Sequence, residues 1–444
     1  MTETARPARI CVVGAGRSGA VAAACLAEMG HYVCALDIDA ARIASFCNGS
    51  APFHEPGLDE LVRSKLDSGH LLFTTEAGEA VPQADFVILA VPTPAARDGR
   101  SNLSALFGAA RELLPLMADD AVLVTRSTVP VGTNAQLAAM VRAERPESAI
   151  EVLSNPEFLR EGHAVQDFLE PERVVIGSNP ANSAGARALA RIYEPLDCPI
   201  IVADLQTAEM AKYAANAYLA SSISFMNEIA NICERTGADV TVVSKALALD
   251  RRIGKHAYLA PGIGYGGSCL PKDLSALVHT AQDNGYTPPM LRAIAEVNEL
   301  QPVRVLSFLN EVYGSVAGLY VAVLGMSFKG DTFDARTSPA LSVIKLLAQA
   351  GAHVRAYDPF ADESAPKYAG QAAQLVADAY SAVEGCHALV VATEHSAFRS
   401  LDLARLGDAM AARVLIDGRN VIDPEAAAEA GFSYIGIGRA RRGD

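Results

Sequence analysis

Short apolar runs alternate with helical stretches along the first part of the chain. Residues 9–13 and 32–36 are apolar runs, and between them residues 20–29 form a stretch of small residues closed by Gly30. A strand buried on both faces of a parallel sheet reads as a continuous apolar run, so this order predicts strand, helix and strand. Four more apolar runs follow, at residues 85–91, 121–125, 152–153 and 173–176. This alternation predicts a doubly wound sheet.

A single long helix is predicted in the middle of the chain. Neither glycine nor proline occurs between Pro199 and Gly237. Residues 206–236 read as one helix, roughly 45 Å long at 1.5 Å per residue. Because its apolar residues cover a wide face, we expect it to pack against a second copy of the chain as well as its own domains. A homodimer or a higher homo-oligomer is therefore expected.

The pattern of the N-terminal region returns after Gly318. Residues 319–324 and 353–357 read as strands, with a helical stretch at 340–350 between them, and further apolar runs follow at residues 388–392 and 414–416. The expected fold class is α/β, with two doubly wound Rossmann-like domains joined by a long central helix and a helical middle domain. The expected domains are residues 1–205, 206–305 and 306–444.

The turn after the first strand has the spacing of a dinucleotide site. Gly14, Gly16 and Gly19 suit a tight turn, a close approach to a pyrophosphate and close helix–strand packing. The second strand ends at Asp37, where an acid holds the ribose hydroxyls of NAD and repels the 2′-phosphate of NADP. NAD is therefore the expected cofactor. The alternative is a glycine turn that serves packing alone.

Composition narrows the possible partners. The 444 residues carry a net charge of −14, and half of them are hydrophobic. An acidic chain without basic runs is not expected to bind nucleic acid or a membrane surface. Its eight cysteines lack paired metal-ligand spacing, so no metal site is expected and a reducing compartment is implied. Met1 to Arg9 hold no apolar signal core, and we expect a cytoplasmic protein.

The segment from Gly266 to Asp273 has the features of a sulfur nucleophile. Two glycines precede Ser268 and Cys269, and a lysine and Asp273 follow within one turn. If Leu270 begins a helix, its free N–H groups and positive dipole end favour a thiolate at Cys269. Asp273 would then face the same way. The alternative is a buried structural cysteine behind a tight turn.

Three further motifs place polar residues where ligands bind. Thr128 follows a buried strand, at the carboxyl edge of the sheet. Glu157 and Glu161 follow the next strand and share one face if their segment is helical, and Lys212 and Asn216 share a face of the long helix. Each also fits an ordinary role, such as a strand-end cap, solvated helix charges or a surface lysine.

Together, and in this order, these motifs resemble the UDP-glucose/GDP-mannose dehydrogenase family. The resemblance runs from Ile10 to about Asp423 and is most specific at residues 155–161, 264–273 and 328–332. It implies oxidation of the C6 alcohol of a nucleotide sugar to a carboxylate, with two NAD+ and one water. The domains would then bind NAD, form a helical dimerisation centre, and bind the nucleotide sugar.

The resemblance also implies roles for particular residues. The implied catalytic residues are Cys269, Lys212, Asn216, Asp273, Glu161 and Thr128. Cys269 would form a thiohemiacetal and then a thioester. Lys212 and Asn216 would stabilise the oxyanions at C6, while Glu161 would accept the proton of the hydrolytic water and Asp273 would orient it. The base of the first oxidation stays open between Lys212 and a water held by Asp273.

Binding residues follow in the same way. The NAD site would be lined by Gly14, Gly16, Gly19, Asp37, Thr93 and Thr128. The substrate would contact Glu157, Phe158, Leu159, Arg252, Tyr265, Gly266, Lys329 and Arg419. Among these, Arg252 would reach the sugar held by a neighbouring subunit, and Lys329 and Arg419 would reach the diphosphate or nucleoside.

The substrate itself is less sharply indicated. Leu270 replaces the phenylalanine usual in UDP-glucose enzymes and is familiar in the GDP-mannose branch, whereas residues 168–177 resemble the UDP-glucose branch. UDP-glucose is favoured, with TDP-glucose and GDP-mannose as alternatives. A two-electron alcohol or hydroxy-acid dehydrogenase would leave Cys269 unexplained. An NAD-binding protein without turnover would leave the whole catalytic set unexplained.

Overall fold

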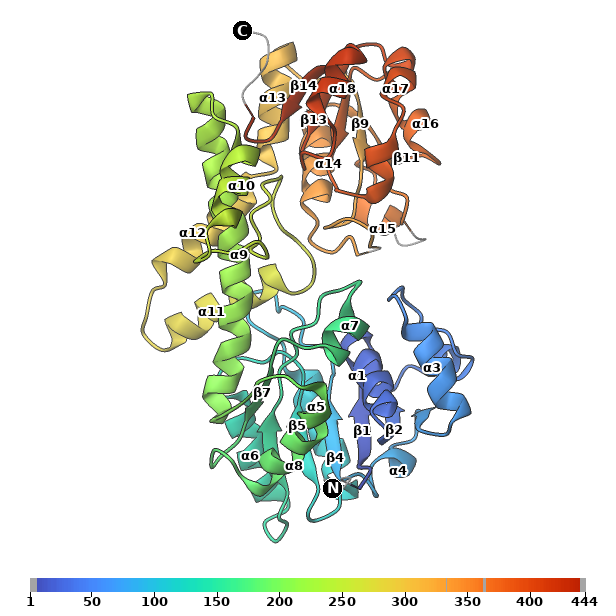
Figure 1. The fold of residues 1–444 in the computed structure, drawn as a ribbon, viewed down its shortest axis with the longest axis vertical. Helices are drawn as coiled ribbons and strands as arrows, with labels where there is room; N and C mark the ends of the chain where they lie inside the picture. Colours follow the sequence, from blue (N-terminus) through green and yellow to red (C-terminus); the bar gives the residue numbers. More distant parts are fainter. Residues whose placement is uncertain (1–5, 333, 362–364, 440–444) are drawn as a thin grey trace. The chain divides into compact units, whose positions relative to one another are not determined.

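The computed structural model describes residues 6–332, 334–361 and 365–439. The chain divides into two compact units, Met1–Ala215 and Asn216–Asp444, and each is described by itself. Figure 1 labels the helices and strands of both. The expected division into three domains stays a prediction.

The first unit is built on an eight-stranded sheet in the order β3-β2-β1-β4-β5-β6-β7-β8. The strands are β1 (Arg9–Val13), β2 (Tyr32–Leu36), β3 (Leu71–Thr74), β4 (Phe86–Leu89), β5 (Val122–Thr125), β6 (Glu151–Ser154), β7 (Val174–Gly177) and β8 (Ile200–Ala203). Strands β1 to β6 pair in parallel, and β7 joins β6 antiparallel through Ser154 and Gly177. The chain crosses from β3, at one edge of the sheet, to β4 on the other side of β1, so the strand order reverses between β1 and β4. Open α/β sheets bind ligands at such a switch point.

Helices connect these strands. They are α1 (Arg17–Glu28), α2 (Ala40–Cys47), α3 (Leu58–Asp67), α4 (Ala77–Ala80), α5 (Ser104–Leu113), α6 (Thr133–Glu144), α7 (Ala164–Leu169) and α8 (Ala184–Tyr193). Helix α1 is buried from Gly19 to Ala27, because its alanines let it lie close against the sheet. Two separate apolar clusters, one containing Val12 and the other Val13, form the core. Successive residues of β1 thus enter different clusters, as expected for a strand covered on both faces.

The long helix is confirmed as α9 (Leu205–Thr236), which has 32 residues. Its part from Asn216 onward belongs to the second unit, with the further helices α10 (Val240–Leu249), α11 (Leu270–Asp283), α12 (Pro289–Leu300) and α13 (Val303–Tyr313). This is the expected helical middle region. Among the helices in the described ranges, none is both long and apolar enough to cross a membrane.

The second unit also contains a six-stranded parallel sheet, in the order β11-β10-β9-β12-β13-β14. Its strands are β9 (Tyr320–Leu324), β10 (His353–Tyr357), β11 (Gln374–Leu375), β12 (Ala388–Val391), β13 (Val414–Asp417) and β14 (Ser433–Gly436). The helices between them are α14 (Pro339–Gln349), α15 (Ala365–Ala369), α16 (Ala379–Val383), α17 (Leu403–Ala409) and α18 (Pro424–Glu429). Because β9 pairs with β10 and β12 as β1 pairs with β2 and β4, the expected second Rossmann-like fold is confirmed.

Candidate active site

The glycine turn of the first unit leaves room for a phosphate. Gly14 has a φ of +98°, and a Cβ there would lie 2.7 Å from the carbonyl oxygen of Ala90. A Cβ at Gly19 would overlap the carbonyl of Gly14, whereas one at Gly16 would meet nothing within 4 Å. Gly16 is the N-cap of α1, so the open space lies at the helix end whose N–H groups attract anions. The turn therefore fits the pyrophosphate of a dinucleotide.

Asp37 directly follows β2 beside this turn and is buried. Its Oδ2 accepts the N–H of Ala15 at 2.7 Å, and its Oδ1 accepts the N–H of Asp39 at 2.9 Å. Arg42 donates to both oxygens, at 3.0 and 2.9 Å. Arg42 was not predicted from the sequence. Asp39 could have indicated it, because an aspartate is a favoured N-cap and Asp39 caps α2, which places Arg42 in the first turn of that helix.

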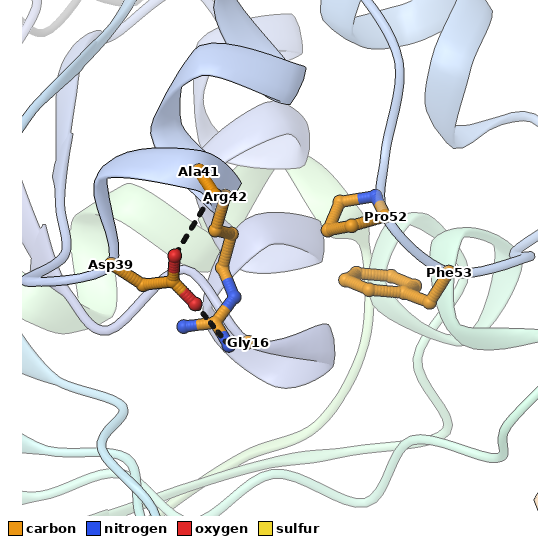
Figure 2. A pocket seen from close by; sticks show the side chains of 6 residues that line it. All are labelled: Gly16, Asp39, Ala41, Arg42, Pro52 and Phe53. Atoms are coloured by element: carbon orange, nitrogen blue, oxygen red, sulfur yellow. Dashed lines mark hydrogen bonds and ion pairs between the residues drawn. The ribbon is translucent and has the colours of Figure 1, made fainter. Parts of the chain in front are cut away.

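A cavity of about 330 Å³ lies next to this acid. It is lined by Gly16, Asp39, Ala41, Arg42, Pro52 and Phe53. Figure 2 shows Asp39 and Arg42 facing Pro52 and Phe53 across it. An aromatic ring and a guanidinium plane on opposite sides suit a flat heterocycle, because both groups stack on π-systems. This cavity has the position and chemistry expected for the adenosine part of NAD.

The carboxyl ends of β4 and β5 are tied together beside the turn. The hydroxyl of Thr93 donates to the carbonyl of Thr128 at 2.8 Å, and that of Ser127 donates to the carbonyl of Val91 at 2.6 Å. These bonds fix the backbone around Thr128, whose side chain is half-buried. Thr93 and Thr128, both expected in the NAD site, are thus brought together.

Glu157 and Glu161 do not share a helix face. Residues 155–160 form a loop, so the condition for a shared face, that the segment is helical, is not met. Asn155 ends the preceding strand region, where its side chain donates to the carbonyl of Val175 at 2.9 Å and accepts the hydroxyl of Tyr193 at 2.7 Å. These buried bonds fix Asn155 at the start of the loop.

The two carboxylates consequently have different partners. Glu157 Oε1 lies 3.7 Å from Nζ of Lys212, which is only 4% exposed and lies over the ring of Phe158 at 5.3 Å. Glu157 Oε2 also accepts the N–H of Leu159 at 2.6 Å. The buried ammonium of Lys212 is thereby matched by one carboxylate and one aromatic face, as a desolvated cation requires.

Glu161 is held by Arg17, from the glycine turn, at 3.1 Å. Arg17 also donates to the carbonyl of His54 at 2.8 Å. Beside it, the buried Glu55 accepts the N–H groups of Gly162 at 3.0 Å and of Ala164 at 2.8 Å. Sequence reasoning missed Arg17 and Glu55 as site residues, because their partners are remote in sequence and no local pattern marks the pairing.

In the second unit the turn formed by residues 266–269, here called the cysteine turn, leads directly into a helix. Helix α11 begins at Leu270 with Cys269 as its N-cap, which confirms the conditional expectation. Cys269 is exposed, and its Sγ lies 3.6 Å from the hydroxyl of Ser268. The carbonyl of Cys269 accepts the N–H of Asp273 at 2.8 Å. The sulfur therefore stands at the helix end that favours a negative charge.

Asp273 and Asn216 form a buried pair. Asn216 donates from Nδ2 to Asp273 Oδ2 at 2.6 Å, and Lys272 donates to Asp273 Oδ1 at 2.6 Å. Asp273 is 1% exposed and Asn216 is 6% exposed. Asp273 thus fixes the amide of Asn216, whose Nδ2 carries a second N–H besides the one in this bond.

The remaining candidates of the second unit lie on three loops. The backbone N–H of Tyr265 donates to Asn298 at 2.7 Å, and burial raises the pKa of the Tyr265 hydroxyl. Arg419 donates to the carbonyl of Phe328 at 3.4 Å and pairs with Glu394 at 3.2 Å. Close to it, a Cβ at Gly262 would lie 2.9 Å from Arg419 Nη1.

Lys329 and Arg252 have simpler surroundings. Lys329 Nζ lies 5.8 Å from the centre of the Phe328 ring. Arg252 is held by Asp250 at 2.6 Å on an exposed turn, with 88% of its side chain accessible. Such exposure is compatible with a role toward another subunit.

Three models of one family match consecutive parts of the chain. The UDP-glucose/GDP-mannose dehydrogenase family is matched by its NAD binding domain over residues 8–197, its central domain over 206–300 and its UDP binding domain over 322–424. The chain belongs to this family. It is an NAD-dependent dehydrogenase of the nucleotide-sugar 6-dehydrogenase type, and the expectations of the cofactor and of nucleotide-sugar binding are confirmed.

Individual relatives support the same assignment. A UDP-glucose 6-dehydrogenase of Bacillus subtilis is 41% identical over 432 residues, covering 97% of this chain and 93% of that protein. One of Rhizobium meliloti is 41% identical over 436 residues and covers 97% and 99%. The UDP-glucose dehydrogenase structure from Pyrobaculum islandicum has a TM-score of 0.91 at 36% identity, with 99% of this chain and 100% of that one covered.

Proposed function

We propose that the enzyme oxidises UDP-glucose to UDP-glucuronate through a thioester on Cys269. The observation that carries the covalent role is that Cys269 is exposed and forms the N-cap of α11. Burial raises the pKa of the thiols of Cys25, to about 12, and Cys34, to about 11. Those thiols stay protonated and unreactive near neutral pH, whereas an exposed cysteine at a helix N-terminus is suited to nucleophilic attack.

The proposed reaction has three steps. The C6 alcohol first loses a hydride and a proton and becomes an aldehyde. The thiol of Cys269 then adds across the carbonyl, and loss of a second hydride and a proton converts the thiohemiacetal into a thioester. Water finally cleaves the C–S bond, which releases the carboxylate and restores the thiol. NAD+, when bound, accepts the hydride of each oxidation.

The residues of the chain would stabilise charge and move protons. Lys212 and Asn216 would stabilise the oxygen at C6 when it carries negative charge, since one supplies a buried cation and the other an amide donor. For the proton of the hydrolytic water, the geometry favours Glu157 over Glu161. Glu157 lies 3.7 Å from Lys212, and Glu161 is paired with Arg17 instead. Asp273 would keep Asn216 oriented through their 2.6 Å bond.

The relatives support the choice of substrate. They are UDP-glucose dehydrogenases, and we propose the same substrate for the present chain. Glu157, Phe158, Leu159, Tyr265 and Gly266 would bind the sugar, and Lys329 and Arg419 the nucleotide. We also propose that two copies of the chain associate, with Arg252 reaching the partner's sugar, and that the domains are residues 1–205, 206–305 and 306–444.

The test replaces Cys269 with serine. C269S should lose acid formation, because an oxygen ester would form and hydrolyse poorly, while the wild type should release two NADH per sugar. Acid production by C269S at the wild-type rate would refute the covalent role, and one NADH per sugar would indicate a two-electron dehydrogenase. Rates with UDP-glucose, TDP-glucose, GDP-mannose and UDP-N-acetyl sugars, measured by NADH absorbance, would decide the substrate.

A further inference from the structure

Thr337 has a backbone conformation that a β-branched residue rarely adopts. Its φ is +49°, in the left-handed region, although it is neither glycine nor asparagine. Such an outlier persists only where surrounding contacts fix it, and it is common at functional sites. Thr337 is exposed and directly precedes Ser338, the N-cap of α14. No core packing by its side chain therefore accounts for the conformation.

The contacts of Thr337 lead to the cysteine turn. Its hydroxyl donates to the carbonyl of Gly267 at 2.8 Å, and the N–H of Gly267 donates to the carbonyl of Arg336 at 3.1 Å. Both backbone groups of Gly267 are thus bound by two adjacent residues. Gly267 stands two positions before Cys269, so this two-point contact fixes the chain immediately ahead of the sulfur.

Close packing reinforces the contact. A Cβ at Gly266 would overlap the carbonyl oxygen of Thr337, and one at Gly267 would lie 2.9 Å from the ring of Phe328. Phe328 directly precedes Lys329, which is proposed to bind the nucleotide. The cysteine turn therefore rests on the segment that carries the proposed nucleotide contacts, and its position depends on that segment.

We infer that Thr337 is a positioning residue for Cys269, which sets the sulfur from the nucleotide-binding side of the second unit. The inference rests on the proposed covalent role of Cys269. The left-handed φ orients the Thr337 side chain so that its hydroxyl donates to the Gly267 carbonyl. This bond holds the cysteine turn in one conformation. Without the hydroxyl, the sulfur would sample positions that are unproductive for attack on the aldehyde.

The test compares T337V with T337S. Valine keeps the branched shape but lacks the hydroxyl, so T337V should lower kcat by about 10- to 100-fold, with KM for the nucleotide sugar changed by less than about twofold. T337S keeps the hydroxyl and should retain most of the wild-type kcat. The matched control is T236V, which removes a hydroxyl that donates to the carbonyl of Ile232 at 3.0 Å on an exposed helix end.

Alkylation by iodoacetamide gives a second readout. In T337V the alkylation rate of Cys269 should change by at least about threefold, while the exposed Cys47 in the same molecule should react unchanged. Unchanged kcat in T337V, or an equal loss in T337S or T236V, would overturn the inference. Loss of activity in C269S with normal activity in T337V would remove this inference alone, whereas full activity of C269S would remove the proposed function.

Discussion

Asp37 is paired with Arg42, and we expect the choice between NAD and NADP to depend on both residues. Its carboxylate is bound by Arg42 at 2.9 and 3.0 Å, next to the cavity that suits adenosine. D37S should free Arg42 to meet a 2′-phosphate and remove the repelling charge. We expect kcat/KM for NADP, relative to NAD, to rise by about 10- to 100-fold. Initial rates with both cofactors measure this, and the double variant D37S/R42A should lose the gain.

Glu157 and Glu161 should differ in their importance for catalysis. E157Q keeps the shape of the side chain but removes the carboxylate beside Lys212, so kcat should fall by about 100-fold or more. E161Q loses the ion pair with Arg17 and should change kcat much less, since Gly162 and Ala164 remain bound to Glu55. Single-turnover measurement of acid release decides between them. A larger loss in E161Q would restore the assignment made from sequence.

Pairs of residues that are far apart in the sequence could not be predicted from it. Arg17 meets Glu161, and Glu55 meets the backbone of Gly162 and Ala164, only because the fold brings these segments together. By contrast, Cys269 and Asp273 were predictable as neighbours, since one helical turn separates them.

At the scale of elements, buried strands were the most predictable. The structure gives β1, β2 and β10 the bounds expected from the sequence. The first residues of β1 and β10, Arg9 and His353, are exposed, and buried apolar residues follow them. Helix α1 begins at Arg17, ahead of the expected Ala20, since the glycine turn enters the helix directly. The antiparallel pairing of β7 was not predictable, because apolar runs carry no direction.

Asp358 directly follows β10 in the second sheet, as Asp37 follows β2 in the first, but the two aspartates have different partners. Asp358 Oδ2 accepts the N–H groups of Met326 at 2.6 Å and Ser327 at 2.9 Å, and Nε2 of the buried His395 lies 3.0 Å away. Nδ1 of His395 accepts the N–H of Asp331 at 2.9 Å, so Nε2 carries the hydrogen. This internal network ties Asp358 to the loop that carries Lys329.

That network predicts a pH dependence of stability. Burial alone would raise the pKa of Asp358, but the bonds from His395 and the backbone lower it from 3.8 to about 2. A lowered acid pKa stabilises the fold above the unfolded value, and this stabilisation is lost as pH falls toward 2. D358N should therefore lower the free energy of unfolding by about 2 kcal/mol at pH 7. The difference from wild type should shrink between pH 4 and 2 in urea titrations followed by circular dichroism. A difference that stays constant with pH would contradict the assignment.

For the whole molecule, helix α9 carries an exposed stripe of apolar residues, which we propose as the contact with a second copy. Tyr218, Phe225 and Ile232 follow one another at seven-residue spacing and are 67%, 52% and 51% exposed. Large exposed apolar residues repeating along one helix face are typical of a protein interface. Sequence predicted an apolar face on this helix, but only the structure shows which of its residues remain uncovered within the single chain.

If Arg252 serves the site of the partner subunit, two inactive variants should restore each other. In a mixed dimer of R252A and C269S, the intact Cys269 of one subunit meets the intact Arg252 of the other, so one site is complete. Random exchange of equal amounts should then recover about a quarter of the wild-type activity, because half of the dimers are mixed and each has one working site. The measurement is NADH formation after co-refolding or subunit exchange, with each variant alone as the baseline. Adding F225D to both variants should abolish the recovery, because a charge in the apolar stripe weakens the contact between subunits. Analytical ultracentrifugation should then show a shift from the dimer mass toward the monomer mass. Activity that never exceeds the sum of the two separate variants would show that Arg252 acts within its own subunit.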